Sequence, residues 1–397
     1  MVKGVGLRLF VGYFMSAPLL GNFSCTQKGK DIQEIGSLPE SKTISLTLID
    51  SIQIPFLGNP MVQDISPSQQ RVVFMDQKVF TEDIFIADFE GNILSTFSKL
   101  GDMPDNHGGI RSPVFISGED SILIYGNRGY LSFDMEGKML SLVKPQEFTG
   151  YSFASFGMGR NFEKYKNKLL YFDQGSRKED YTQISLYDEL QVLNWHHPKT
   201  GKKIPFNPLP ESSIFKSGKY FFRQAWFPAF SIGDNLIYVV YGIEPIIYAF
   251  DVEEPHELKK SIPLNLNDYE LFPGLGEYTD DFRKLGLGFE WGKIENIKRI
   301  GDYFVLAYFP GYDATDRELQ WENKTPEEAI AFRESIPKKY PKRIQVTDLE
   351  GNRLLDFAPY HYHPETMLLR EGQLWVMAKP NPDVEEDFFK VYRLVLE

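Results

Sequence analysis

An acidic pentapeptide that contains glycine occurs three times in the chain, as DFEGN at 88–92, DMEGK at 134–138 and DLEGN at 348–352. Each copy lies between two apolar segments rich in aliphatic and aromatic residues, which suit a pleated, half-buried sheet. A hairpin with a type I turn and a bulge needs glycine at the fourth place, and the leading Asp can accept hydrogen bonds from the turn. The repeat therefore predicts three hairpins in a repeated β-fold.

A calcium loop is the alternative interpretation of this pentapeptide. Acidic residues at alternate positions before a glycine are typical of such loops, but the ion needs six or more oxygen ligands. Each copy offers two nearby acids and no further bidentate Glu at loop spacing. We therefore prefer the structural turn, which joins two strands of one sheet.

The segments around the pentapeptides repeat as units of four short strands. Residues 112–143 contain four apolar runs separated by turns, the pattern of an antiparallel meander. In several units a Pro opens the first strand, where its missing N–H is tolerated. Six such units are expected, at 59–97, 112–143, 150–206, 227–264, 286–357 and 363–397.

The last of these units is one strand short, whereas a strand pattern at 42–56 has no unit of its own. We expect this N-terminal strand to complete the last sheet, because a closed ring hides the sheet edges that would otherwise pair with other chains. The predicted fold class is all-β, a six-bladed β-propeller over residues 43–397.

An insertion at about 311–342 interrupts the fifth unit. Its segment TPEEAIAFRESI carries an N-cap, Thr325, followed by Pro326 and by Glu328 at the capping-box position. We expect one short helix in blade five, which either seals a blade edge or covers the channel.

The first 25 residues have the layout of a secretory signal peptide. Lys3 and Arg8 precede a mostly apolar run from Leu9 to Leu20, which is too short for a stable membrane span. The sequence therefore predicts an exported protein.

Cys25, the one cysteine of the chain, follows this apolar run. The segment resembles a bacterial lipoprotein signal, in which the Cys after the cleavage point is lipidated, although Asn22 stands where an aliphatic residue is usual. A plain signal peptide with an incidental Cys is the alternative. We expect a lipid anchor in a membrane of the bacterial cell envelope, followed by a polar tether at 26–42.

The region 88–140, DFEGNILSTFSKLGDMPDN…SPVFISGEDSILIYGNRGYLSFDMEGKML, resembles the NHL-type six-bladed propellers. Those alternate a D-x-x-G turn, an outer strand, a Gly- and Pro-rich crossover and an inner strand that starts with Pro. With the signal and Cys25, residues 42–397 are similar to an uncharacterised family of bacterial six-bladed propeller lipoproteins. The resemblance implies the fold and no particular activity.

Candidate ligand-binding residues lie near the expected starts of the inner strands. Trp faces stack on sugars or peptides and Arg grips carboxylates, whereas the plainer alternative is that the Trp side chains fill gaps between blades. The candidates are Arg111, Arg160, Arg223, Trp226, Trp291 and His363.

The chemistry expected at these positions is binding. The formal net charge of −12 disfavours nucleic acid as a partner. No G-x-S-x-G elbow, H-E-x-x-H motif or phosphate-binding glycine loop occurs, so we expect no cofactor and no metal, although His361 and His363 would share a strand face. The preferred function is a binding protein for a peptide, a glycan or an envelope protein. An extracellular hydrolase or lyase with its site in the channel is the alternative.

Overall fold

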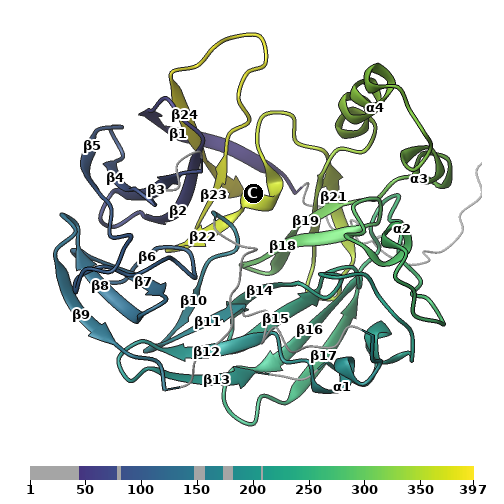
Figure 1. Ribbon diagram of the computed structural model, residues 1–397, viewed down its shortest axis with the longest axis horizontal. Coiled ribbons are helices and arrows are strands. Elements are labelled where there is room, and N and C mark those ends of the chain that lie inside the picture. The colour runs from purple at the N-terminus through teal and green to yellow at the C-terminus, as the bar shows by residue number, and fades with distance from the viewer. Residues whose placement is uncertain (1–43, 78–81, 147–156, 173–181, 207–208) are drawn as a thin grey trace, which may run out of the picture. The chain divides into compact units, whose positions relative to one another are not determined.

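The computed structural model describes residues 44–77, 82–146, 157–172, 182–206 and 209–397. Their strands form six four-stranded antiparallel sheets, arranged as the blades of a β-propeller (Figure 1). The predicted fold class is confirmed. The predicted signal segment, Cys25 and the predicted tether lie outside the described residues.

Each of the first three blades is built from four strands consecutive in the chain. Blade one contains β2 (Pro60–Ser66), β3 (Arg71–Asp76), β4 (Ile84–Asp88) and β5 (Ile93–Phe97). Blade two contains β6 (Phe115–Ile116), β7 (Ser121–Gly126), β8 (Gly129–Asp134) and β9 (Met139–Val143). Blade three contains β10 (Glu163–Tyr165), β11 (Lys168–Phe172), β12 (Leu193–His197) and β13 (Lys202–Phe206).

Blades four and five follow the same plan, and blade six departs from it. Blade four contains β14 (Pro228–Gly233), β15 (Leu236–Tyr241), β16 (Ile246–Asp251) and β17 (Leu258–Pro263). Blade five contains β18 (Lys293–Ile300), β19 (Tyr303–Phe309), β20 (Arg343–Thr347) and β21 (Arg353–Phe357). Blade six contains β22 (Leu368–Arg370), β23 (Gln373–Met377), β24 (Phe388–Leu396) and β1 (Leu46–Pro55).

Blade six joins the two ends of the described chain. Strand β1 pairs antiparallel with β24, with Leu46 opposite Leu396 and Pro55 opposite Phe388. The backbone N–H of Ser45 donates to the carbonyl oxygen of Glu397 at 2.8 Å. The first and last parts of the fold are therefore held in one sheet.

The pentapeptides form the turns between the third and fourth strands of their blades. Gly91, Gly137 and Gly351 have φ values of 91°, 85° and 88°. In the first copy, Oδ1 of Asp88 accepts a hydrogen bond from the backbone N–H of Asn92 at 2.8 Å, and the β4–β5 register shifts beside the turn. The turn interpretation is confirmed, because the Asp carboxylate serves the turn's own backbone.

The glycine of each turn also packs against the outer strand of the preceding blade. A Cβ on Gly91 would overlap the carbonyl oxygen of Gln53 in β1, and one on Gly351 would overlap that of Pro263 in β17. Gly201, in the corresponding turn of blade three, lies as close to the carbonyl oxygen of Lys144. Glycine is thus required both by the backbone conformation and by contact between blades.

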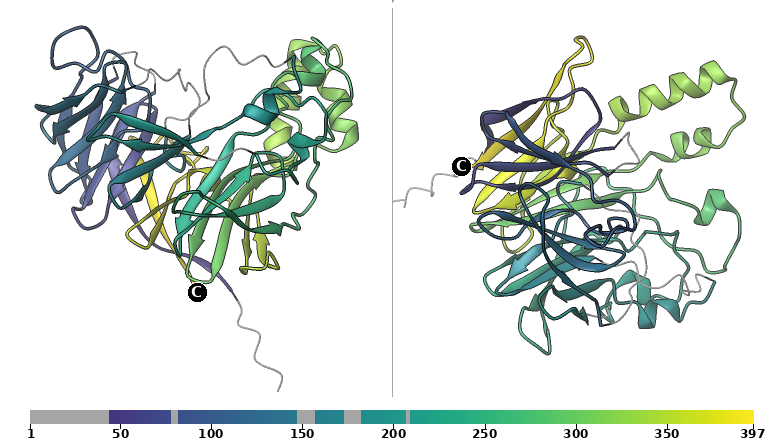
Figure 2. Two further views of the ribbon diagram at one scale, coloured as in Figure 1. Left: turned by 90° about the horizontal axis from the view of Figure 1, so that it is seen from below. Right: turned by 60° about the vertical axis from the view of Figure 1, so that its left-hand side comes forward.

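Every helix of the described chain lies in a connection that opens on one face. In a four-stranded antiparallel meander, the first strand begins and the second ends at the same edge, so we call this side the entry face. Its helices are α1 (Leu186–Glu189), η1 (Ile214–Lys216), α2 (Phe282–Leu285), α3 (Ala314–Gln320), α4 (Pro326–Lys339) and η2 (Pro364–Thr366). Figure 2 shows α3 and α4 projecting from the sheets.

The insertion in blade five contains two helices where the sequence predicts one. Thr325 caps α4, since its hydroxyl accepts from the N–H of Glu328 while the Glu328 carboxylate accepts from the N–H of Thr325 at 2.8 Å. Within α4 only Ile336 is buried. Among the described residues, no helix combines the length and apolar character needed to cross a bilayer.

Candidate ligand-binding site at the entry face

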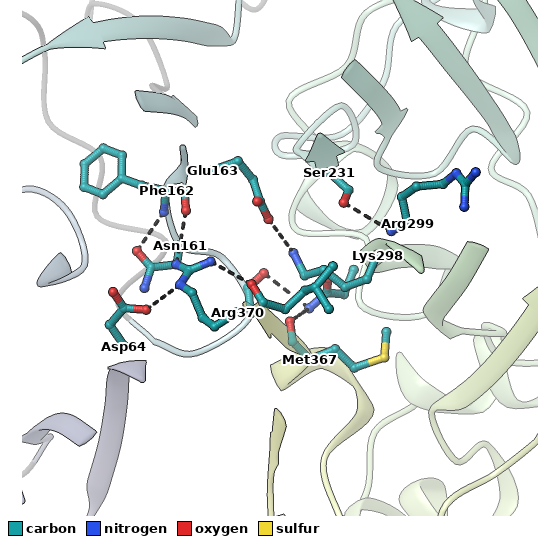
Figure 3. Close-up of polar contacts among 12 residues, drawn as sticks. Asp64, Asn161, Phe162, Glu163, Ser231, Lys298, Arg299, Met367 and Arg370 are labelled. Carbon is teal, nitrogen blue, oxygen red and sulfur yellow. Dashed lines mark hydrogen bonds and ion pairs between the residues drawn. The ribbon is translucent and has the colours of Figure 1, made fainter. Parts of the chain in front are cut away.

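The innermost strands surround the propeller axis, and buried polar side chains fill the space between them (Figure 3). Asp64 of β2 is 1% exposed. Its Oδ1 accepts a hydrogen bond from Nε of Arg370 at 2.8 Å, and its Oδ2 accepts one from the N–H of Ile116 at 2.9 Å. Arg370 also donates to the carbonyl oxygen of Phe162 at 3.1 Å. This group joins blades one, two, three and six.

A second set of contacts joins blades three, five and six. Nζ of Lys298 lies 3.1 Å from Oε1 of Glu163. The amide of Asn296 donates to the carbonyl oxygen of Met367 at 2.8 Å. Burial raises the pKa of Asp64 and lowers the pKa of Lys298, and the partner's charge opposes the shift in each case. The centre of the ring is therefore a network of paired groups.

Nearer the entry face lies a second charged group, here called the mouth cluster. Its members occupy the starts or ends of strands, or the connections beside them, in blades three, five and six. They are Arg160, Lys293, Glu295, Lys342, His363, Glu365 and Lys379. Four basic side chains, not counting the histidine, thus accompany two carboxylates on a chain whose net charge is −12.

Both carboxylates of the mouth cluster are bound by one lysine. Nζ of Lys342 lies 2.8 Å from Oε2 of Glu295 and 2.9 Å from Oε1 of Glu365. Nδ1 of His363 lies 3.6 Å from the same oxygen of Glu365. Burial would raise the pKa of Glu365, but the contact with His363 and the charge of Lys342 outweigh it and hold this pKa at about 2. Glu365 is therefore ionised at neutral pH.

Lys293 and Arg160 lack such a partner. Among the described residues, neither side chain forms an ion pair or a hydrogen bond. Burial, together with the charge of Arg160, lowers the pKa of Lys293 to about 8, so most Lys293 side chains remain protonated at pH 7. Nζ of Lys293 lies 5.5 Å from the centre of the Phe227 ring. The cationic side chains of Arg160 and Lys293 therefore lie near each other, and Lys293 faces the Phe227 ring.

A small cavity opens beside Arg160, and its wall includes Phe227, the ring that Lys293 faces. Its volume is about 10 Å³, close to the space of one water molecule. Its lining combines one guanidinium with apolar rings, from Arg160, Phe172, Phe227, Pro228 and Phe230. Such a site suits a small polar group attached to an apolar body.

The structure places four of the six predicted site residues in three settings. Arg160 and His363 belong to the mouth cluster. Trp226 is 2% exposed and packs against Tyr187, with ring centres 5.7 Å apart. Trp291 is half-buried, and the guanidinium carbon of Arg317 lies 4.3 Å from the centre of the Trp291 ring.

The remaining two predicted residues lie elsewhere on the entry face. Arg223 is exposed on the connection before β14, next to the buried Trp226. Nε of Arg111, in the connection before β6, donates to Oδ1 of Asn127. Whether any of the six predicted residues contacts a ligand stays a prediction.

The sequence interpretation missed Lys293, Glu295, Lys342 and Glu365. One signal was available: the charged residues Lys293 and Glu295 lie at the start of an innermost strand, in KIENI. In the structure Glu295 lies where the β18–β19 register shifts, so simple strand alternation does not give the direction of its side chain. Within the described ranges, no group of three His, Cys, Asp or Glu side chains could hold a metal ion.

Solved structures resemble this chain, although no protein-family model and no curated protein matches its sequence. A member of the DUF4221 family from Bacteroides vulgatus shares 13% identity, covering 89% of this chain and 99% of its own, with a TM-score of 0.63. A protein of Bacteroides fragilis described as exported shares 8% identity over 89% of this chain and 95% of its own, with a TM-score of 0.48. A PQQ-bound aldose sugar dehydrogenase from Streptomyces coelicolor shares 11% identity over 89% of this chain and 98% of its own, with a TM-score of 0.44. The likeness to the Bacteroides vulgatus protein shows that the two chains share one fold.

Proposed function

We propose that this protein is an exported, lipid-anchored β-propeller that binds a peptide, glycan or protein partner at the mouth cluster. The observation that carries the proposal is the pair Arg160 and Lys293, which has no carboxylate partner among the described residues. Both side chains are partly buried, and a partly buried charge without a partner is costly for the folded protein. An anionic group on a ligand would offset that cost, so the pair favours a site that is completed on binding.

Binding is preferred to hydrolysis or elimination because of how the acids at the centre of the ring and in the mouth cluster are used. A general acid or base has to exchange a proton with the substrate. Asp64 and Glu163 are bound by Arg370 and Lys298, and Lys342 holds both Glu295 and Glu365. The exposed Arg223 and the half-buried Trp291 remain candidates for contact with the outer part of a ligand.

A hydrogen-exchange experiment tests the proposed site. The full chain, purified in detergent, would be incubated with neutral and acidic oligosaccharides and with neutral and acidic peptides. We expect at least one probe to slow exchange of the backbone amides at 293–296 while leaving the outer strand β17 unchanged. Protection confined to outer strands, or no protection by any probe, would contradict the proposal.

The anchor is tested separately by metabolic labelling with radioactive palmitate. We expect the full-length protein to incorporate label and to sediment with membranes, and the Cys25→Ala variant to lose both properties. Equal labelling of the two proteins would exclude Cys25 as the attachment point.

A further inference from the structure

We propose that the ligand is anchored through a carboxylate held between Arg160 and Lys293, with its adjoining apolar part against Phe227 and Phe230. This inference rests on the proposed function, because it names the chemical group that the same site recognises. It assigns to two cations the role of binding one anion.

The geometry of the pair suits a carboxylate. The planar guanidinium of Arg160 presents donors that match carboxylate oxygens, and the ammonium of Lys293 acts as a point charge. The cavity of about 10 Å³ admits one oxygen-sized group, which a flat carboxylate can insert more easily than a tetrahedral phosphate. Glu295, whose charge also acts on Lys293, disfavours a second negative charge on the ligand.

The mouth cluster already contains one lysine whose charge is paired with carboxylates. Lys342 is held by Glu295 and Glu365 at 2.8 and 2.9 Å. Lys293 begins the strand that also carries Glu295, yet no carboxylate of the described chain lies within ion-pair distance of it. A ligand carboxylate would therefore form an ion pair with Lys293, as Glu365 does with Lys342.

The apolar lining defines the rest of the ligand. Phe172, Phe227 and Phe230 surround the cavity and offer no hydrogen bonds from their side chains, so they select a C–H-rich surface next to the carboxylate. The ring face of an acidic sugar and the side chain of an acidic peptide both have this chemistry. The experiment distinguishes these two sources of the same group.

Calorimetric titration of the full chain in detergent tests the proposal with two matched pairs of probes. One pair is trigalacturonate and its methyl ester, and the other is a Glu-containing tripeptide and its Gln counterpart, both with blocked ends. We expect the acidic member of one pair to bind at least tenfold more tightly than its neutral counterpart. The pair that shows the difference identifies the source as sugar or peptide.

Two variants and one control locate the effect. We expect Lys293→Met and Arg160→Gln each to weaken binding of the acidic probe at least tenfold. Lys293→Met removes a partly buried charge while keeping an apolar chain of similar length. Arg160→Gln gives an independent result if Lys293→Met folds poorly. The control Lys260→Met makes the same change on the outer strand β17, where the side chain is about half exposed, and should leave affinity unchanged.

The pH dependence of binding gives a second readout. The groups that act on Lys293 are Arg160, Glu295 and Lys342. Because its pKa is about 8, Lys293 loses its proton as the pH rises from 7 to 9, so affinity should fall over this range in the wild type and stay flat in Lys293→Met. Equal affinity for acidic and neutral probes would overturn the carboxylate anchor and leave the binding site standing. If no probe binds or protects 293–296, both proposals fail.

Discussion

Replacing Arg370 with Met is expected to lower the free energy of unfolding by about 3–5 kcal/mol at pH 7. The change leaves the carboxyl group of Asp64, which is 1% exposed, without its countercharge at the centre of the ring. The N–H of Ile116 would still donate to Asp64, but one neutral donor does not replace a guanidinium. Urea denaturation of the two proteins measures the difference.

The pH dependence of this loss identifies its cause. Burial already raises the pKa of Asp64 above the ordinary value of an Asp side chain, and removal of Arg370 is expected to raise it further. The folded variant therefore binds a proton at a higher pH than the unfolded chain does, so lowering the pH favours its folded state. The difference from the wild type should shrink between pH 7 and pH 4.

A matched variant on the outside of the ring serves as control. Arg393→Met breaks the ion pair with Asp50 between β24 and β1, where the two side chains are 31% and 47% exposed. We expect a loss below about 1 kcal/mol, as for other surface pairs. Similar losses in the two variants, or a loss in Arg370→Met that does not change with pH, would contradict the role given to the buried pair.

Replacing Gly91 with Ala is expected to lower the free energy of unfolding by about 3 kcal/mol, from roughly 1–2 kcal/mol of left-handed strain and roughly 1–3 kcal/mol of overpacking. Gly91 has φ 91°, and its added methyl group would overlap the carbonyl oxygen of Gln53 in blade six. Neither the turn nor β1 can move without disturbing the contact between blades. Thermal or urea denaturation measures the effect.

Gly372 provides the control for this prediction. It also adopts a positive φ, 76°, in the turn between β22 and β23, but an added Cβ would meet nothing within 4 Å. Gly372→Ala should therefore cost only the strain, about 1–2 kcal/mol. If the two variants lose the same free energy, the contact of Gly91 with the neighbouring blade has no energetic role.

The fold was predictable from the sequence because its signals are local. The pentapeptide turn depends on its own Asp and Gly, and the dense apolar strands such as β15 are buried for nearly their whole length. The capping box of α4 likewise depends on residues three apart. Even the place of β1 followed from a missing strand in the last unit.

The site was less predictable because its contacts join distant parts of the chain. Arg370 meets Asp64 across 306 residues, and Lys298 meets Glu163 across 135. A single sequence does not reveal which charge on one inner strand faces which charge on another. The prediction of Arg160 and His363 rested on their position near strand starts, and the same reasoning favoured Trp226, whose ring belongs to the core.

The way blade six is assembled also brings both ends of the described chain to one side of the propeller. Strand β1 runs antiparallel to β24 and leads to the start of β2 on the entry face, so β1 itself begins on the opposite side. Ser45 and Glu397 are hydrogen-bonded to each other there. A fluorophore or affinity tag added after Glu397 would therefore lie on the side of the propeller opposite the entry face, away from the mouth cluster.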